Sequence, residues 1–125
     1  MTVKSETSLL SHLLRRAGFG ANYDETEAYA EMGYEATVEK FLDPESEPNF
    51  DYYDFIRRHP CAEGGPAIFP TQLNFLYFLL NTKHPLEEKM ALFWHQVFAT
   101  GYGKVDDFRS LVDQIKMFRE EGMGN

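Results

Sequence analysis

Cysteine is almost missing from this 125-residue sequence, which contains only Cys61. A single cysteine excludes an internal disulfide, and it also excludes a zinc site built on cysteine pairs. The four histidines are scattered, and none belongs to the H-E-x-x-H arrangement of a helical zinc site. The sequence therefore predicts no metal site.

Glycine-rich phosphate-binding loops are missing as well. The stretches GFG (residues 18–20) and GYG (residues 101–103) match neither the P-loop nor the dinucleotide-binding pattern, and no strand pattern precedes them. The sequence thus leaves any cofactor unknown.

Positive charge is scarce: 12 Lys and Arg stand against 20 Asp and Glu, and the formal net charge is −8. Nucleic acids and anionic membrane surfaces are bound largely through Lys and Arg. The acidic balance therefore argues against a nucleic-acid partner, and the short Arg15-Arg16 and Arg57-Arg58 pairs do not change this.

Long hydrophobic runs are also missing. The longest, around LNFLYFLLN (residues 73–81), is far shorter than the ~20 residues that a membrane span needs. The N-terminus has no apolar segment followed by small residues, as a secretory signal would have. We expect a soluble, cytoplasmic protein with no membrane span.

Apolar residues are nevertheless plentiful, at 43% of the chain with 15% aromatics, which is enough for a core. No stretch alternates as a strand does, so the sequence predicts an all-α fold of five or six helices in a single helical region, 1–125. The expected helices span residues 5–17, 24–32, 34–43, 71–82, 85–99 and 107–120.

Helix boundaries follow from capping residues. Ser5 is expected to cap the first helix, either Asn22 or Asp24 the second, and Pro85 to begin the fifth. In the third helix the spacing predicts a buried side formed by Tyr34, Val38, Phe41 and Leu42. The fourth helix, residues 71–82, is apolar almost all round, which predicts burial on most sides.

Residues 44–70 differ from the rest because they hold five of the six prolines. We expect a long loop here, with a helical turn or two at residues 51–59. Its packing anchors are expected to be Phe50, Tyr53, Phe55, Ile68 and Phe69.

The main chemical candidates are His95 and Glu88, which share one face of the fifth helix. Seven residues separate them, about 10 Å of helical rise, so they could only line opposite ends of one cavity. His95 is either a hydrogen-bonded core residue or a base or ligand in a pocket. Glu88 either favours the helix dipole or lines the same pocket. His12 could join Arg15 or Arg16 in an anion site, or lie on a solvated helix face.

Two stretches, HLLRRAGFGA (residues 12–21) and PLEEKMALFWHQVFATG (residues 85–101), resemble the N-terminal region of the domain-of-unknown-function 1800 family of bacterial proteins. The resemblance implies a largely helical protein of several hundred residues with no established reaction. It directs attention to the matching positions His12, Arg16, Glu88, Trp94 and His95.

The chain departs from the family pattern in two ways. Many members carry a second histidine two places after the first, where this chain has Val97, which weakens a paired-histidine metal site. A later family block rich in Asn-Glu-Asn and Arg-Glu-Leu-Leu-Glu is missing here. We therefore expect an N-terminal fragment of a larger domain.

Two hypotheses about function remain. The first is a scaffold or interaction portion of a larger protein, whose partner is its own C-terminal region or another protein. The alternative is part of an enzyme whose pocket, lined by Glu88 and His95, is completed by a missing C-terminal half. His12, Arg16 and Trp94 are further candidates for a pocket or an anion site.

Overall fold

The computed structural model describes residues 3–48, 50–59, 68–105 and 107–124, and these ranges contain helices and no strand. The prediction of an all-α fold is thereby confirmed. The helices are α1 (Val3–Ala17), α2 (Tyr23–Met32), α3 (Tyr34–Leu42), the 3₁₀ helix η1 (Pro44–Ser46), α4 (Tyr52–Arg58), α5 (Ile68–Asn81), α6 (Pro85–Val97) and α7 (Phe108–Glu121).

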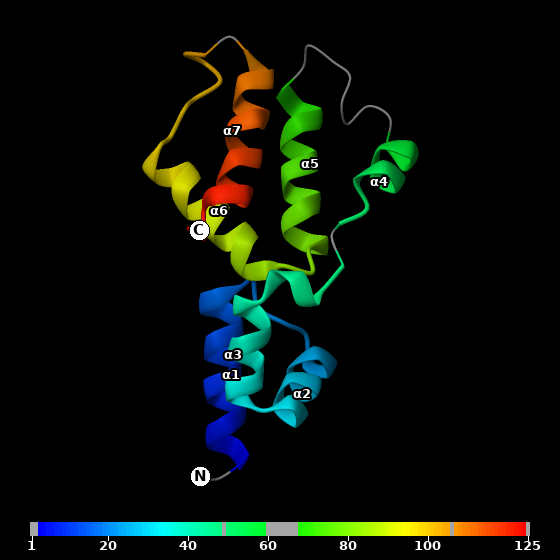
Figure 1. Ribbon diagram of the computed structural model, residues 1–125, viewed down its shortest axis with the longest axis vertical. Helices are drawn as coiled ribbons and strands as arrows, with labels where there is room; N and C mark the ends of the chain where they lie inside the picture. Colours follow the sequence, from blue (N-terminus) through cyan, green and yellow to red (C-terminus); the bar gives the residue numbers. More distant parts are fainter. Residues whose placement is uncertain (1–2, 49, 60–67, 106, 125) are drawn as a thin grey trace.

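The helices form two lobes stacked end to end (Figure 1). The N-terminal lobe holds α1, α2 and α3, and the C-terminal lobe holds α5, α6 and α7 with α4 at its side. The start of α6 contacts α1 and α3, so this helix joins the lobes. Each lobe therefore has its own small core.

In the N-terminal lobe, α1 turns one stripe of leucines toward α3. Leu10 is fully buried and Leu14 is 3% exposed, whereas the adjacent Leu9 is 41% exposed. The helix begins at Val3, two residues before the predicted cap at Ser5, so that cap prediction was wrong. Arg15 and Arg16 lie in the last turn of the helix, where positive charge interacts favourably with the helix dipole.

A reciprocal cap begins α2. The Asn22 side chain accepts a hydrogen bond from the Glu25 backbone N–H at 2.9 Å, and the Glu25 carboxylate accepts from the Asn22 N–H at 2.9 Å. This capping box satisfies two N–H groups that the first turn leaves without helical partners. The cap is therefore Asn22, one of the two residues that the sequence offered.

Gly33 lies between α2 and α3 with φ 92° and ψ 159°, a region that side chains with a Cβ rarely adopt. We expect Gly33→Ala to lower the free energy of unfolding by about 1–3 kcal/mol because of this strain. Gly101 is the matched control: it has no positive φ and open space around its Cα, so Gly101→Ala should have little effect. Chemical denaturation of both variants checks the prediction, and equal stabilities would contradict it.

In α3 the predicted buried side was partly wrong. Phe41 is 8% exposed as expected, but Tyr34 and Leu42 are 41% and 57% exposed. The fully buried residue is Thr37, whose hydroxyl donates to the Gly33 carbonyl at 2.8 Å. Because this bond satisfies the hydroxyl locally, a polar side chain can be buried here at little cost.

The helical turn or two expected at residues 51–59 is present as α4, a seven-residue helix. It brings the count in the described ranges to seven α-helices, one more than the five or six expected. Phe50 and Phe55 are packing anchors as predicted, and both contact Phe78 of α5. Tyr53 and Phe69 are 81% and 64% exposed, so they are not anchors. Cys61 and the side chain of Ile68 lie outside the described residues.

The burial predicted for α5 was wrong. Its inner face carries Phe75 and Phe78, which are partly buried among the other helices of the lobe, while its outer face stays exposed. In Figure 1, α6 and α7 lie on one side of α5 and α4 lies on the other, yet no side chain described in α5 is fully buried. The apolar pattern around α5 therefore predicted more burial than the described residues of this helix have.

Candidate functional site

A buried ion pair joins α6 to α7 in the C-terminal lobe. Glu88 is 4% exposed, and its Oε1 accepts a hydrogen bond from Nε of Arg119 at 2.7 Å. Glu88 lies in the first turn of α6, where a carboxylate also favours the helix dipole. The carboxylate is therefore stabilised by the dipole of α6 and by Arg119, which lies 31 positions later in the chain.

Arg119 is also packed between this carboxylate and two aromatic rings of α5. Its guanidinium carbon lies 4.4 Å from the ring centre of Phe78 and 5.8 Å from that of Phe75. A cation over an aromatic face is attracted by the negative charge on that face. Arg119 therefore links all three helices of the lobe.

His95 lies on the same face of α6 as Glu88, two turns farther along. Its ring is half-buried, with its centre 6.1 Å from that of Phe75. Within the described residues, its Nδ1 is buried without a hydrogen-bond partner, as are Oε2 of Glu88 and Nη2 of Arg119. Buried polar atoms are normally paired, so these unpartnered atoms distinguish Glu88, His95 and Arg119 from the other polar side chains of the described ranges.

Burial raises the pKa of the Glu88 carboxyl, because removing a carboxylate from water disfavours its charged form. Arg119 opposes this shift through its charge and its hydrogen bond, and burial outweighs it. A carboxyl with a raised pKa at the centre of a helical lobe is one of the features that mark candidate functional residues.

Trp94 closes the far end of the α6–α7 interface. Its indole N–H donates to the Gly122 carbonyl at 2.8 Å, and its ring stacks on Phe98, with centres 5.7 Å apart. A Cβ on Gly122 would collide with the carbonyl oxygen of Phe118, so only glycine fits under the indole without rearrangement. In the described residues Trp94 therefore holds the end of α7.

Lys89 makes a contact between the lobes that sequence reasoning missed. Its ammonium donates to the Gly18 carbonyl at 3.0 Å and the Arg15 carbonyl at 3.5 Å, and it lies 5.0 Å from the ring centre of Phe19. It thus satisfies carbonyls at the C-terminus of α1 from the start of α6. The only sequence signal for Lys89 was its position next to Glu88 in PLEEKMALFWHQVFATG (residues 85–101), one of the two stretches that carry the family resemblance.

His12 and Arg16 lie exposed on α1, in the other lobe from Glu88 and His95. In the described ranges, neither side chain has a hydrogen bond or an ion pair. The structure therefore brings these two residues neither to Glu88 nor to His95, and their role in a pocket or anion site stays a prediction.

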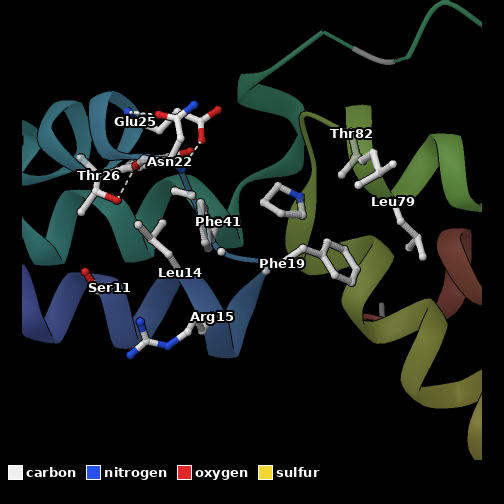
Figure 2. A pocket seen from close by; sticks show the side chains of 16 residues that line it. Ser11, Leu14, Arg15, Phe19, Asn22, Glu25, Thr26, Phe41, Leu79 and Thr82 are labelled. Carbon is white, nitrogen blue, oxygen red and sulfur yellow. Dashed lines mark hydrogen bonds between the residues drawn. The ribbon is translucent and has the colours of Figure 1, made fainter.

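A cavity of about 590 Å³ lies where the two lobes meet (Figure 2). Its walls come from the end of α1, the turn after it, α2, α3, the end of α5 and the start of α6. Leu14 and Phe41, both almost fully buried, lie side by side between α1 and α3 (Figure 2). Neither Glu88 nor His95 lines this cavity.

Among the described side chains, no group of three or more His, Cys, Asp or Glu is placed to hold a metal ion. No helix among the described residues is long and apolar enough to cross a membrane.

A family model matches residues 12–125, a range that includes both stretches that carry the resemblance. The comparisons with curated proteins and with solved structures gave no match. The chain therefore belongs to the family described as Protein of unknown function (DUF1800).

Proposed function

We propose that this chain is a helical scaffold portion of a larger protein and that it binds further polypeptide through the outer face of α5. The observation that carries this proposal is a row of exposed apolar side chains on that face. The row, here called the α5 stripe, consists of Phe69, Leu73, Leu76 and Leu80, which are 64%, 49%, 53% and 82% exposed.

The spacing of the α5 stripe is that of a helix-binding surface. Its members follow one another by four, three and four residues, so they lie in one line along the helix. Anchors at this spacing are what a second helix contacts when it packs against a groove. Phe78, on the opposite face, packs within the C-terminal lobe. The helix α5 therefore has two apolar faces, one packed within the lobe and one exposed.

A contiguous row of apolar side chains exposed to water is unfavourable, and contact with a partner removes that unfavourable exposure. Single apolar residues on a surface are common, but contiguous exposed patches mark sites of interaction. The helix α5 also contains no Asp, Glu, Lys or Arg, so no charged side chain on it would have to be desolvated when an apolar surface binds. The partner is either further chain of the same protein or another protein.

Dye binding tests the proposal, because 8-anilinonaphthalene-1-sulfonate fluoresces when it occupies apolar surface. We expect the chain to enhance this fluorescence, and Leu73→Glu or Leu76→Glu to reduce the enhancement several-fold. Leu42→Glu is the matched control, since Leu42 is 57% exposed on α3 and lies outside the α5 stripe. A chain that binds no dye, or stripe variants that bind as well as the parent, would contradict the proposal.

An enzyme pocket lined by Glu88 and His95 is the second candidate. The unpartnered buried atoms of these residues favour it, whereas the engagement of Glu88 by Arg119 supports a structural role. Modification by diethyl pyrocarbonate, measured by mass spectrometry, distinguishes an enzyme pocket from a structural role. Rapid modification of His95 would support a pocket, and a His95 that resists modification while the exposed His12 reacts would count against it.

A further inference from the structure

We infer that the cavity between the lobes binds a zwitterion of about dipeptide length, with its carboxylate held by α1 and its ammonium held at the start of α2. This inference goes beyond the proposed function, because it assigns a small-molecule site that does not depend on binding along the α5 stripe. The observations that carry it are polar groups of opposite charge, without protein partners, on two walls of one cavity.

The α1 wall of the cavity supplies hydrogen-bond donors. Ser11 and Arg15 both line the cavity, and because four residues separate them they lie on one face of α1. Ser11 is half-buried and Arg15 is exposed, and within the described residues neither side chain has a hydrogen bond or an ion pair. A guanidinium can donate two parallel hydrogen bonds to a carboxylate, and a serine hydroxyl can donate one more. This wall therefore suits the carboxylate of a ligand.

The α2 wall carries the opposite charge. Glu25 lines the cavity, and its Oε2 accepts from the Asn22 N–H at 2.9 Å in the capping box. Its Oε1 has no hydrogen bond within the part of the chain that the structure describes. Glu25 and Arg15 lie on opposite sides of Leu14 and Phe41 (Figure 2). A ligand with only negative charge would be repelled by Glu25, whereas a ligand that also carries an ammonium is attracted to both walls.

Other polar side chains of the cavity wall already have partners. The Thr26 hydroxyl donates to the Asn22 carbonyl at 2.7 Å, and the Thr82 hydroxyl accepts from the His84 N–H at 2.9 Å. The Asn22 side chain accepts from the Glu25 N–H at 2.9 Å. The charged groups that remain available to a ligand are therefore the guanidinium on α1 and the carboxylate on α2.

The size of the cavity indicates the length of the ligand. Its volume of about 590 Å³ lies within the roughly 300–1,000 Å³ of small-molecule sites. A cube of this volume is about 8 Å across, and two residues of extended chain span about 7 Å. A dipeptide thus places its two charged ends near opposite walls, whereas a single amino acid carries both charges on one carbon. Its side chains would contact Leu14 and Phe41, which are 3% and 8% exposed.

Isothermal titration calorimetry of the intact chain with three matched peptides tests the inference. Leu-Leu is the zwitterion, N-acetyl-Leu-Leu lacks the ammonium, and Leu-Leu-amide lacks the carboxylate. We expect Leu-Leu to bind about tenfold more tightly than either blocked peptide, because each blocked end loses charge-assisted hydrogen bonds. Free leucine should also bind more weakly than Leu-Leu, because it cannot reach both walls.

Two substitutions assign the ends of the ligand to the two walls. Arg15→Gln should abolish the preference for Leu-Leu over Leu-Leu-amide, and Glu25→Gln should abolish the preference over N-acetyl-Leu-Leu. In Glu25→Gln the side-chain amide oxygen can still accept from the Asn22 N–H, so the capping box is retained. Arg16→Gln and Glu31→Gln are matched controls, because both residues are exposed on the same helices and neither lines the cavity. Both preferences should persist in the controls.

Several outcomes would overturn the inference. Equal binding of the three peptides, or no binding of any of them, would exclude a zwitterion site. Preferences that persist in both Arg15→Gln and Glu25→Gln would exclude this cavity as the site, and free leucine that binds as tightly as Leu-Leu would overturn the assigned length. Leu73→Glu, which alters the α5 stripe, should leave peptide binding unchanged, so a failure of the proposed function is distinguishable from a failure of this inference.

Discussion

Replacing Arg119 by methionine is expected to lower the free energy of unfolding by about 3 kcal/mol or more at neutral pH. The substitution keeps most of the side-chain volume but leaves Glu88, 4% exposed, as a buried carboxylate without its partner. Urea denaturation followed by the fluorescence of Trp94, the single tryptophan, measures the change. Glu120→Met is the control, since Glu120 is the exposed neighbour on the same helix and should change stability by less than about 0.5 kcal/mol.

Two further variants test the same ion pair. Glu88→Leu should cost less than Arg119→Met, because the Arg119 side chain is 20% exposed and can turn toward water. The double variant should recover much of the loss, since neither charge is then buried alone. Additive losses in the double variant would show that the pair is not coupled, in contradiction to the 2.7 Å contact.

The pH dependence of Arg119→Met has a defined sign. The pKa of Glu88 is raised by burial even beside Arg119, and removing that cation raises it further. The folded variant then binds the proton more tightly than the unfolded chain, so its stability falls as pH rises above the ordinary glutamate value of 4.5. The cost of the substitution should therefore be smallest near pH 4.5 and largest at neutral pH. A cost that does not change with pH would contradict this account.

Replacing Leu10 by alanine is expected to lower the free energy of unfolding by about 2–5 kcal/mol. Leu10 is fully buried against the rest of the N-terminal lobe, so its truncation loses apolar burial and leaves a cavity. Leu9→Ala is a matched control, because it is the same chemical change one residue away, at a side chain that is 41% exposed. It should cost about 1 kcal/mol or less.

Circular dichroism at 222 nm during thermal unfolding measures both leucine variants. The change in helix propensity is the same for the two substitutions, so their difference reports burial alone. Equal effects would mean that α1 does not pack against α3 as described. A domain of this size has only 5–15 kcal/mol of total stability, so the larger effect could unfold the N-terminal lobe.

The helices of this chain could be predicted from local patterns. Asn22, one of the two caps expected for α2, and the first-turn Pro85 mark helix starts that the structure confirms. The last helix, expected from residue 107, begins at Phe108 with Asp107 as its cap. These features are visible in sequence because they depend on neighbours within one turn. The helical turn or two expected at residues 51–59 is likewise present, as the seven-residue helix α4.

The candidate site could be predicted only in part. Sequence spacing placed Glu88 and His95 on one helix face, and both turn toward the interior of the C-terminal lobe. It could not supply Arg119 as the partner of Glu88, because those residues lie 31 positions apart on different helices. Lys89 was missed for the same reason, since its acceptors are carbonyls of α1 about 70 residues away.

What the sequence determined by itself is the set of helices, the acidic balance and the membership of the family, because these depend on residue types and their local order. What the tertiary structure decided is which apolar faces are covered. The pattern of α5 is equally apolar on both sides, yet Phe78 is packed against Arg119 while Leu80 is 82% exposed. Burial depends on which helices come to lie beside a face, and that is fixed by contacts between distant segments of the chain.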